Sequence, residues 1–141
     1  MAEEAAEMAG WSMPKQGEFV WSEIAASDAD AAQAFYANVF GWSFKGGDAS
    51  NTGMDYREFS TDGGERPAGG LYQINAEFFG GNPPPPHWMI YVAVDDVDAN
   101  AELAKSLGAE VHKVLDVPNV GRMAIMQDPT GAMIATFKPK V

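Results

Sequence analysis

Residues 91–111 of the chain read YVAVDDVDANAELAKSLGAEV, and residues 23–43 read EIAASDADAAQAFYANVFGWS. Each stretch contains a short apolar run, a cluster of acids, an alanine-rich segment with helical spacing and then a glycine. When Asp28 is aligned with Asp96, the distance from the acid to Gly41 or Gly108 differs by one residue. The repetition indicates that the chain contains two copies of one structural unit.

The first copy predicts a strand, a helix and three further strands. FVWSEIA (19–25) alternates as a strand does, with Trp21, Glu23 and Ala25 on one face. Ser27 or Asp28 caps a helix over 29–40, which Gly41 ends. WSFK, MDYREFS and GGLYQIN follow as short strands between glycine-bearing turns. The apolar positions of the helix are Ala32, Phe35, Tyr36, Val39 and Phe40.

The second copy repeats this order after the connector AEFFGGNPPPP, whose prolines neither continue a helix nor donate to a sheet. We expect a strand at HWMIYVAV, and then a helix capped by Asp95 or Asp96. A further strand follows at AEVHKVLDV. The module ends in a hairpin of GRMAIMQ and AMIATF around DPTG, whose residues suit a type I turn. The expected buried side of this helix holds Val97, Ala101, Ala104 and Leu107.

These patterns predict an α+β fold in which two tandem βαβββ modules form a curled mixed sheet around a shared cleft. The expected boundaries are an acidic flexible tail at 1–16 and a single domain at 17–141. Within that domain we expect module one at 18–74, a linker at 75–86 and module two at 87–139.

The bulk composition excludes several classes of function. Among 141 residues no apolar run is long enough to span a membrane, and the first residues lack the basic start of a signal peptide. The absence of cysteine excludes disulfides and zinc–thiolate sites, and it fits a cytoplasmic protein. The net charge is −11, of which residues 1–16 contribute −2 (three glutamates against Lys15), so the acidic body repels nucleic acid and anionic membranes.

The order and spacing of AFYANVFGW, VDDVDA, LGA and GR…DPTGA resemble the vicinal oxygen chelate superfamily over residues 18–139. That superfamily includes glyoxalase I, the bleomycin-resistance proteins and the extradiol dioxygenases. The resemblance implies a divalent metal held by His, Gln or Glu on the cleft-facing strands. The matching positions, counted from Asp28, Asp96 and Asp128, carry Trp21, Met89 and Ala135, while a fourth falls in GGLYQIN, where Gln73 is the one candidate. Indole, thioether and methyl groups do not suit a hard cation, so we expect no metal and no cofactor.

What remains is an apolar, aromatic cleft suited to a planar or hydrophobic small molecule. Glu23 and Tyr91 would orient the ligand, and no residue is assigned a catalytic role. Alternatively, Trp21 and Met89 fill a closed barrel. Because an unpaired buried carboxylate is costly, Glu23 is expected to reach solvent in an open cleft, to pair with Arg57 or Lys45, or to bind a ligand. The candidate ligand-binding residues are Trp21, Glu23, His87, Met89, Tyr91, Met133, Ala135 and Phe137.

Three functions are compatible with these residues. The first is a metal-free small-molecule binding protein of the glyoxalase/bleomycin-resistance type. The second is an enzyme of the same fold, lyase or dioxygenase-like, with an irregular metal site or with Glu23, Tyr91 or His87 as acid and base. The third is a structural or interaction dimer with a closed cleft. His112 is expected to be an exposed strand residue, and a homodimer is expected for the chain.

Overall fold

The computed structural model describes residues 14–46, 55–64 and 66–140. Internal contacts divide the chain into two compact units, a first unit spanning Trp21–Met89 and a second comprising Ile90–Val141 together with Met1–Val20. Strands β1 and β5 each cross from one unit to the other. None of the helices in the described residues is long and apolar enough to cross a membrane.

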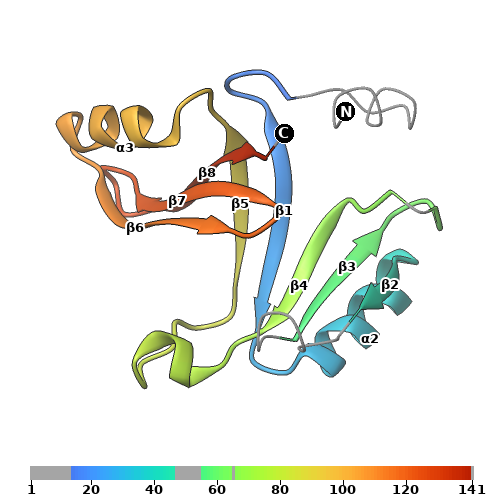
Figure 1. Ribbon diagram of the computed structural model, residues 1–141. Helices are drawn as coiled ribbons and strands as arrows, with labels where there is room; N and C mark the ends of the chain where they lie inside the picture. The colour runs from blue at the N-terminus through green and yellow to red at the C-terminus, as the bar shows by residue number, and fades with distance from the viewer. Residues whose placement is uncertain (1–13, 47–54, 65, 141) are drawn as a thin grey trace. The chain divides into compact units, whose positions relative to one another are not determined.

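The first unit contains the predicted helix and its strands in the order β2-β3-β4-β1 (Figure 1). β1 runs parallel to β4, whereas β4 with β3 and β3 with β2 are antiparallel. The connector predicted after β4 contains a short 3-10 helix, η1. The elements are β1 (Phe19–Ala26), α2 (Ala29–Phe40), β2 (Ser43–Gly46), β3 (Tyr56–Ser60), β4 (Gly69–Gln73) and η1 (Ala76–Phe79).

Helix α2 begins and ends at the residues that the sequence predicts. The Asp28 side chain accepts a hydrogen bond from the backbone N–H of Ala31, so Asp28 is the N-cap. Gly41 follows the helix with a left-handed backbone, φ 74°, and its N–H bonds the carbonyl of Ala37.

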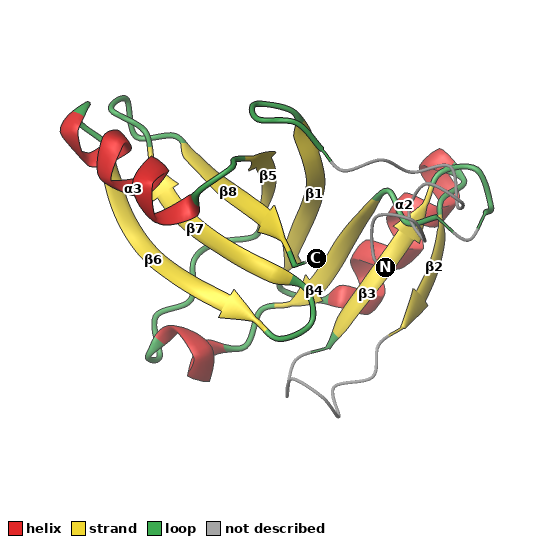
Figure 2. Ribbon diagram, turned by 45° about the horizontal axis from the view of Figure 1, so that its top comes forward, coloured by secondary structure: helices red, strands yellow, loops and turns green. Residues whose placement is uncertain are grey.

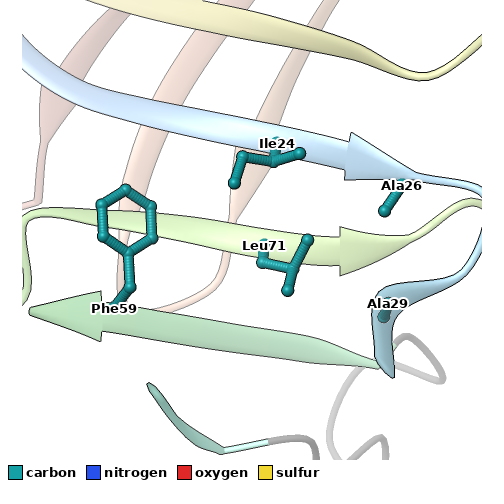
Figure 3. Packing of buried hydrophobic residues seen from close by; sticks show 5 residues of the cluster. All are labelled: Ile24, Ala26, Ala29, Phe59 and Leu71. Carbon is teal, nitrogen blue, oxygen red and sulfur yellow. The ribbon is translucent and has the colours of Figure 1, made fainter. Parts of the chain in front are cut away.

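The core of the first unit lies between α2 and one face of its strands. Ile24 and Ala26 of β1, Leu71 of β4 and Phe59 of β3 pack together with Ala29 at the start of α2, as Figure 3 shows. Leu71 is fully buried. Because side chains alternate along a strand, this packing assigns Ile24 and Ala26 to the helix-covered face of β1 and Trp21, Glu23 and Ala25 to the opposite face.

The second unit repeats the arrangement, with strand order β5-β8-β7-β6 (Figure 2). β5 is parallel to β8, and the two other pairs are antiparallel, as in the first unit. α3 contacts β6, β7 and β8. The elements are β5 (His87–Ala93), α3 (Val97–Ser106), β6 (Glu110–Val117), β7 (Gly121–Gln127) and β8 (Met133–Pro139). The fold is therefore α+β with two tandem βαβββ modules, as predicted.

The second helix also has the predicted N-cap, since Asp96 accepts from the N–H of Ala99. The turn of the predicted hairpin closes with a hydrogen bond from the N–H of Gly131 to the carbonyl of Asp128. His112 is exposed, as expected, and its Nε2 lies 3.3 Å from Gln127 Oε1.

Helical spacing misidentified one position of the second helix as buried, and it does not show which apolar positions of the first helix are covered. Leu107, expected on the buried side of the second helix, is 69% exposed. In α2, Phe35, Val39 and Phe40 are all more than half exposed, although they belong to the apolar set of that helix. The tail prediction falls on residues 1–13, which lie outside the described residues, and on 14–16. In that described part, Gln16 accepts a hydrogen bond from the N–H of Asp95.

Candidate functional site

The face of the first unit that α2 does not cover carries a cluster of aromatic and carboxylate side chains. Strand register places Glu23 opposite Gly70 and Ala25 opposite Tyr72 in the β1–β4 pair. Tyr56 of β3 is in turn opposite Tyr72 of β4. Because paired residues share a face, Glu23, Tyr56 and Tyr72 lie with Trp21 on this side.

A chain of two hydrogen bonds joins three of these side chains. The indole Nε1–H of Trp21 donates to the hydroxyl of Tyr56 at 2.9 Å, and that hydroxyl donates to Glu23 Oε2 at 2.6 Å. The second distance is typical of a hydroxyl bonded to an ionised carboxylate. All three side chains are part-buried, so they are positioned by their neighbours and remain accessible to a ligand. We call this set the Trp21–Tyr56–Glu23 chain.

Gly70 makes room for this arrangement. A Cβ atom at Gly70 would collide with the hydroxyl of Tyr56 and would lie 2.5 Å from its Cζ. The second unit contains a similar packing, since a Cβ at Gly121 would lie 2.8 Å from the ring of Phe137. In both units an aromatic side chain covers a glycine diagonally across an antiparallel pair.

The electrostatics of the face are set by burial and by Glu23. Burial, and then the negative charge of Glu23, raise the pKa of Tyr72 to about 12. Tyr72 therefore keeps its phenolic proton throughout the physiological range and is available as a hydrogen-bond donor.

The structure excludes one partner that the sequence suggested for Glu23. Arg57 lies on the helix-covered side, where its guanidinium binds Asp30 and Asp55, each at 2.8 Å, and Gln33 at 2.9 Å. The hydrogen bond and charge of Arg57 in turn lower the pKa of Asp55. Of the alternatives considered for Glu23, pairing with Arg57 is therefore wrong, because Arg57 follows Tyr56 directly and adjacent strand residues point to opposite faces.

Gln73 is not available as a metal ligand. Its Oε1 accepts from the N–H of Ala29 at 2.8 Å, and its Nε2 donates to the carbonyl of Ser27 at 2.7 Å. The side chain thus serves as a non-local cap for the first turn of α2, on the face opposite to Glu23.

The other mapped positions also lack donors for a metal. Met89 and Ala135 are buried and offer a thioether and a methyl group, and the indole nitrogen of Trp21 is occupied as a donor. In the part of the chain that the structure describes, no three His, Cys, Asp or Glu side chains are grouped as a metal site requires. The residues at these positions do not fit the divalent metal that the resemblance implies.

The remaining predicted residues occupy different places. His87 lies with Trp88 and Tyr36 along a groove on the α2 side, and its Nδ1 is 2.8 Å from the carbonyl of Pro85. In the second unit β5 and β8 pair Tyr91 with Ala135, and both are buried. Met133 of the same strand is 42% exposed, and Phe137 is part-buried over Gly121.

Sequence reasoning did not identify Tyr56 or Tyr72. The signal that could have found Tyr56 is the alternation in MDYREFS, which separates Tyr56 and Glu58 from Arg57 and Phe59. The face on which each set lies follows only from the pairing of β3 with β4.

Comparison with known proteins adds a family to this geometry. A family model described as a glyoxalase-like domain matches residues 21–137. The protein named "Putative glyoxylase CFP32" of Mycobacterium tuberculosis is 34% identical over 128 residues, which cover 87% of this chain and 44% of that protein. The anthracycline biosynthesis protein DnrV of Streptomyces peucetius is 32% identical over 129 residues, with coverages of 86% and 46%. The chain thus spans less than half the length of these relatives.

Solved structures share the fold at low sequence identity. Methylmalonyl-CoA epimerase from Mycobacterium tuberculosis superposes with a TM-score of 0.57 at 18% identity, covering 89% of each chain. A glyoxalase/bleomycin resistance protein/dioxygenase superfamily member from Vibrio splendidus 12B01 gives 0.56 at 15% identity, covering 85% of this chain and 98% of that one. At these identities the likeness establishes the architecture, and function has to be argued from the site.

Proposed function

Because the chain belongs to the glyoxalase-like domain family, we propose that it binds a small planar aromatic molecule, without a bound metal, on the face that carries the Trp21–Tyr56–Glu23 chain. The observation that supports this most is the pair of hydrogen bonds that joins Trp21, Tyr56 and Glu23. A carboxylate held at 2.6 Å by a tyrosine on a part-buried aromatic surface offers one strong acceptor beside flat rings.

The chemistry of the face defines the class of ligand. Rings at Trp21, Tyr56 and Tyr72 favour stacking or edge contacts with a planar body. Glu23 accepts a hydrogen bond from a ligand hydroxyl, and the protonated Tyr72 donates one to a ligand carbonyl. A phenolic or quinone-bearing polycycle satisfies both groups. Two relatives carry names of anthracycline biosynthesis, and anthracyclines are molecules of this kind.

The binding test uses quinizarin, a neutral dihydroxyanthraquinone that absorbs visible light. Titration should quench tryptophan fluorescence and shift the quinone absorbance in parallel. Tyr56→Phe and Glu23→Gln should each weaken binding by about 10-fold or more, because a hydrogen bond to a charged group contributes roughly 1.5–3 kcal/mol.

The matched control is Tyr36→Phe, which removes a hydroxyl from α2 in the same unit. It should leave quinizarin affinity unchanged. Equal losses in Tyr36→Phe and Tyr56→Phe, or failure of the parent protein to bind any member of a panel of hydroxylated polycycles, would refute the proposed site. One tightly held transition metal per chain after dialysis, found by elemental analysis, would refute the metal-free part.

The short Tyr56–Glu23 contact also favours a second candidate, metal-independent acid–base catalysis with Glu23 accepting a substrate proton. The first substrate to test is the hemithioacetal of methylglyoxal and glutathione, assayed with chelator and with added divalent metals. Turnover that persists with chelator and disappears in Glu23→Gln would support an enzyme, whereas binding without turnover would support the binding protein.

A further inference from the structure

The turn that follows β3 contains the single Asp–Gly dipeptide of the chain. Residues 60–64 read STDGG, and the sequence contains no Asn–Gly dipeptide. Asp62 and Gly63 are exposed, and they lie outside the β3–β4 ladder, which ends at the pair of Phe59 with Gly69. An aspartate before a glycine can close a five-membered ring through the next backbone nitrogen, because glycine has no side chain to obstruct that nitrogen.

The conformation of this turn brings the reacting groups together. Asp62 Oδ1 accepts a hydrogen bond from the N–H of Gly64 at 2.8 Å, which makes an Asx turn. In such a turn the carboxyl group folds back over the peptide that joins Asp62 to Gly63. Gly63 has a left-handed backbone, φ 73°, and a Cβ atom built on it would meet no atom within 4 Å. The carboxyl carbon and the Gly63 nitrogen therefore have open space in which to react.

The N–H of Gly63 is also available for the reaction. Within the residues that the structure describes, it donates to no hydrogen-bond acceptor. The N–H of Ala29, which follows Asp28, is by contrast held by Gln73 Oε1 at 2.8 Å. Asp128 precedes a proline, which has no N–H to lose. Both the sequence and the hydrogen bonding thus favour attack on the carboxyl group of Asp62.

We propose that Asp62 is a modification site at which the chain isomerises to isoaspartate, and that the product is a substrate for a methyltransferase that recognises isoaspartate. The Gly63 nitrogen bonds to Asp62 Cγ, and its proton leaves with the carboxyl hydroxyl as water, which gives a cyclic succinimide. A second water molecule then opens the ring. Cleavage between the nitrogen and Cγ restores aspartate, whereas cleavage between the nitrogen and the α-carbonyl carbon routes the backbone through Cβ and Cγ. Neither step needs an oxidant, a reductant or a cofactor.

The product presents the group that such an enzyme modifies. Isoaspartate at position 62 carries a free α-carboxylate on an exposed turn, where an enzyme can reach the backbone. Transfer of a methyl group from a sulfonium donor to this carboxylate gives an ester. Attack of the Gly63 nitrogen on the ester then expels methanol and forms the succinimide again, so repeated cycles return the residue to aspartate.

The isomerised chain should remain folded. Its backbone is one methylene group longer, but the added atom lies in the turn, beyond the last pair of the β3–β4 ladder. Tyr56 stands at the other end of β3, so the hydrogen bonds of the Trp21–Tyr56–Glu23 chain are kept. We therefore expect the far-UV circular dichroism and the quinizarin affinity of the aged protein to match those of the fresh protein.

Ageing of the purified protein at pH 7 and 37 °C tests the proposal. Peptide mapping should resolve the peptide around Asp62 into two species of equal mass, of which the protease Asp-N cuts only the aspartate form. A purified isoaspartyl methyltransferase with a labelled methyl donor should label the aged protein much more than the fresh protein. Asp116, an exposed aspartate inside β6, is the internal control and should stay aspartate.

Asp62→Glu should lose the methyl label, because a glutamate would have to close a less favourable six-membered ring. A single species at Asp62 after ageing, or labelling of Asp62→Glu at the parent's level, overturns the proposal. The contribution of the folded turn is measured by ageing the full chain unfolded in denaturant. Isomerisation at Asp62 should be at least as fast in the folded protein, and isomerisation found only in the unfolded chain would also overturn the proposal, because the turn would then protect Asp62.

Discussion

Replacing Gly70 by alanine should destabilise the protein, although a glycine-to-alanine change at a strand position without a positive φ usually stabilises it by about 0.4–1 kcal/mol. The added Cβ would occupy the position of the Tyr56 hydroxyl, so the Tyr56 side chain must move. Its hydrogen bonds to Trp21 and Glu23 would be lost. Roughly 1 kcal/mol for the neutral bond and 1.5–3 kcal/mol for the bond to the carboxylate exceed the entropic gain of 0.4–1 kcal/mol, so the net loss should be about 1.5–3.5 kcal/mol.

A double-mutant cycle isolates this cause. The three atoms nearest to the added Cβ all belong to Tyr56, so Tyr56→Ala removes the obstacle. In that background Gly70→Ala should be neutral or stabilise the fold by up to about 1 kcal/mol. The free energies of unfolding of the four proteins, measured in urea with far-UV circular dichroism, give the coupling. An equal loss in both backgrounds would refute the reasoning, because the cost would then come from the strand and not from Tyr56.

Three further predictions test other parts of the structure. Gln73→Ala should lower the free energy of unfolding by about 1–3 kcal/mol in urea denaturation, because it leaves the N–H of Ala29 and the carbonyl of Ser27 without this partner. Arg57→Met should reduce stability at pH 7, and its difference from the parent should shrink as pH falls below 3.8, because the pKa of Asp55 is lowered in the folded state and its contribution is lost on protonation; a pH-independent difference in thermal unfolding would contradict this. Ultraviolet titration should show that Tyr72 ionises at about 12. Tyr72→Phe should remove this ionisation step, and Glu23→Gln should lower its pKa only in part, since burial is the larger cause.

The helices and strands could be predicted from the sequence because their signals are local. The N-cap at Asp28, the helix end at Gly41 and the alternation along β1 each depend on residues only a few positions apart in the sequence. The exposed face of α2 could not be predicted in the same way. Helical spacing shows that apolar residues form a stripe, but it does not say whether the protein's own sheet covers that stripe, and Phe35 lies outside the covered part.

The candidate site required contacts between residues far apart in the sequence. Tyr56 meets Glu23 because β4 lies between β1 and β3 and sets the register of both. Gln73 was considered as a metal ligand because a glutamine side chain can coordinate a metal. Its actual partners, Ser27 and Ala29, lie near it only because β1 and β4 pair in parallel, which the sequence does not show. The sequence gives residue types, and strand pairing decides which of them meet.

The two modules carry different side chains at equivalent strand positions. Strand register makes Glu23 and Gly70 of the first unit equivalent to Tyr91 and Ala135 of the second, since each pair joins the first and last strand of its module. By the same register, Tyr56 corresponds to Met123 and Tyr72 to Phe137. Glu23, Tyr56 and Tyr72 of the first unit each carry a polar group that can bond a ligand, whereas in the second unit Tyr91 alone of their counterparts does, and Met123 and Phe137 are apolar. If the proposed site is correct, polar substitutions at Glu23, Tyr56 and Tyr72 should alter ligand recognition, because they change the groups on β1, β3 and β4 that can bond a ligand.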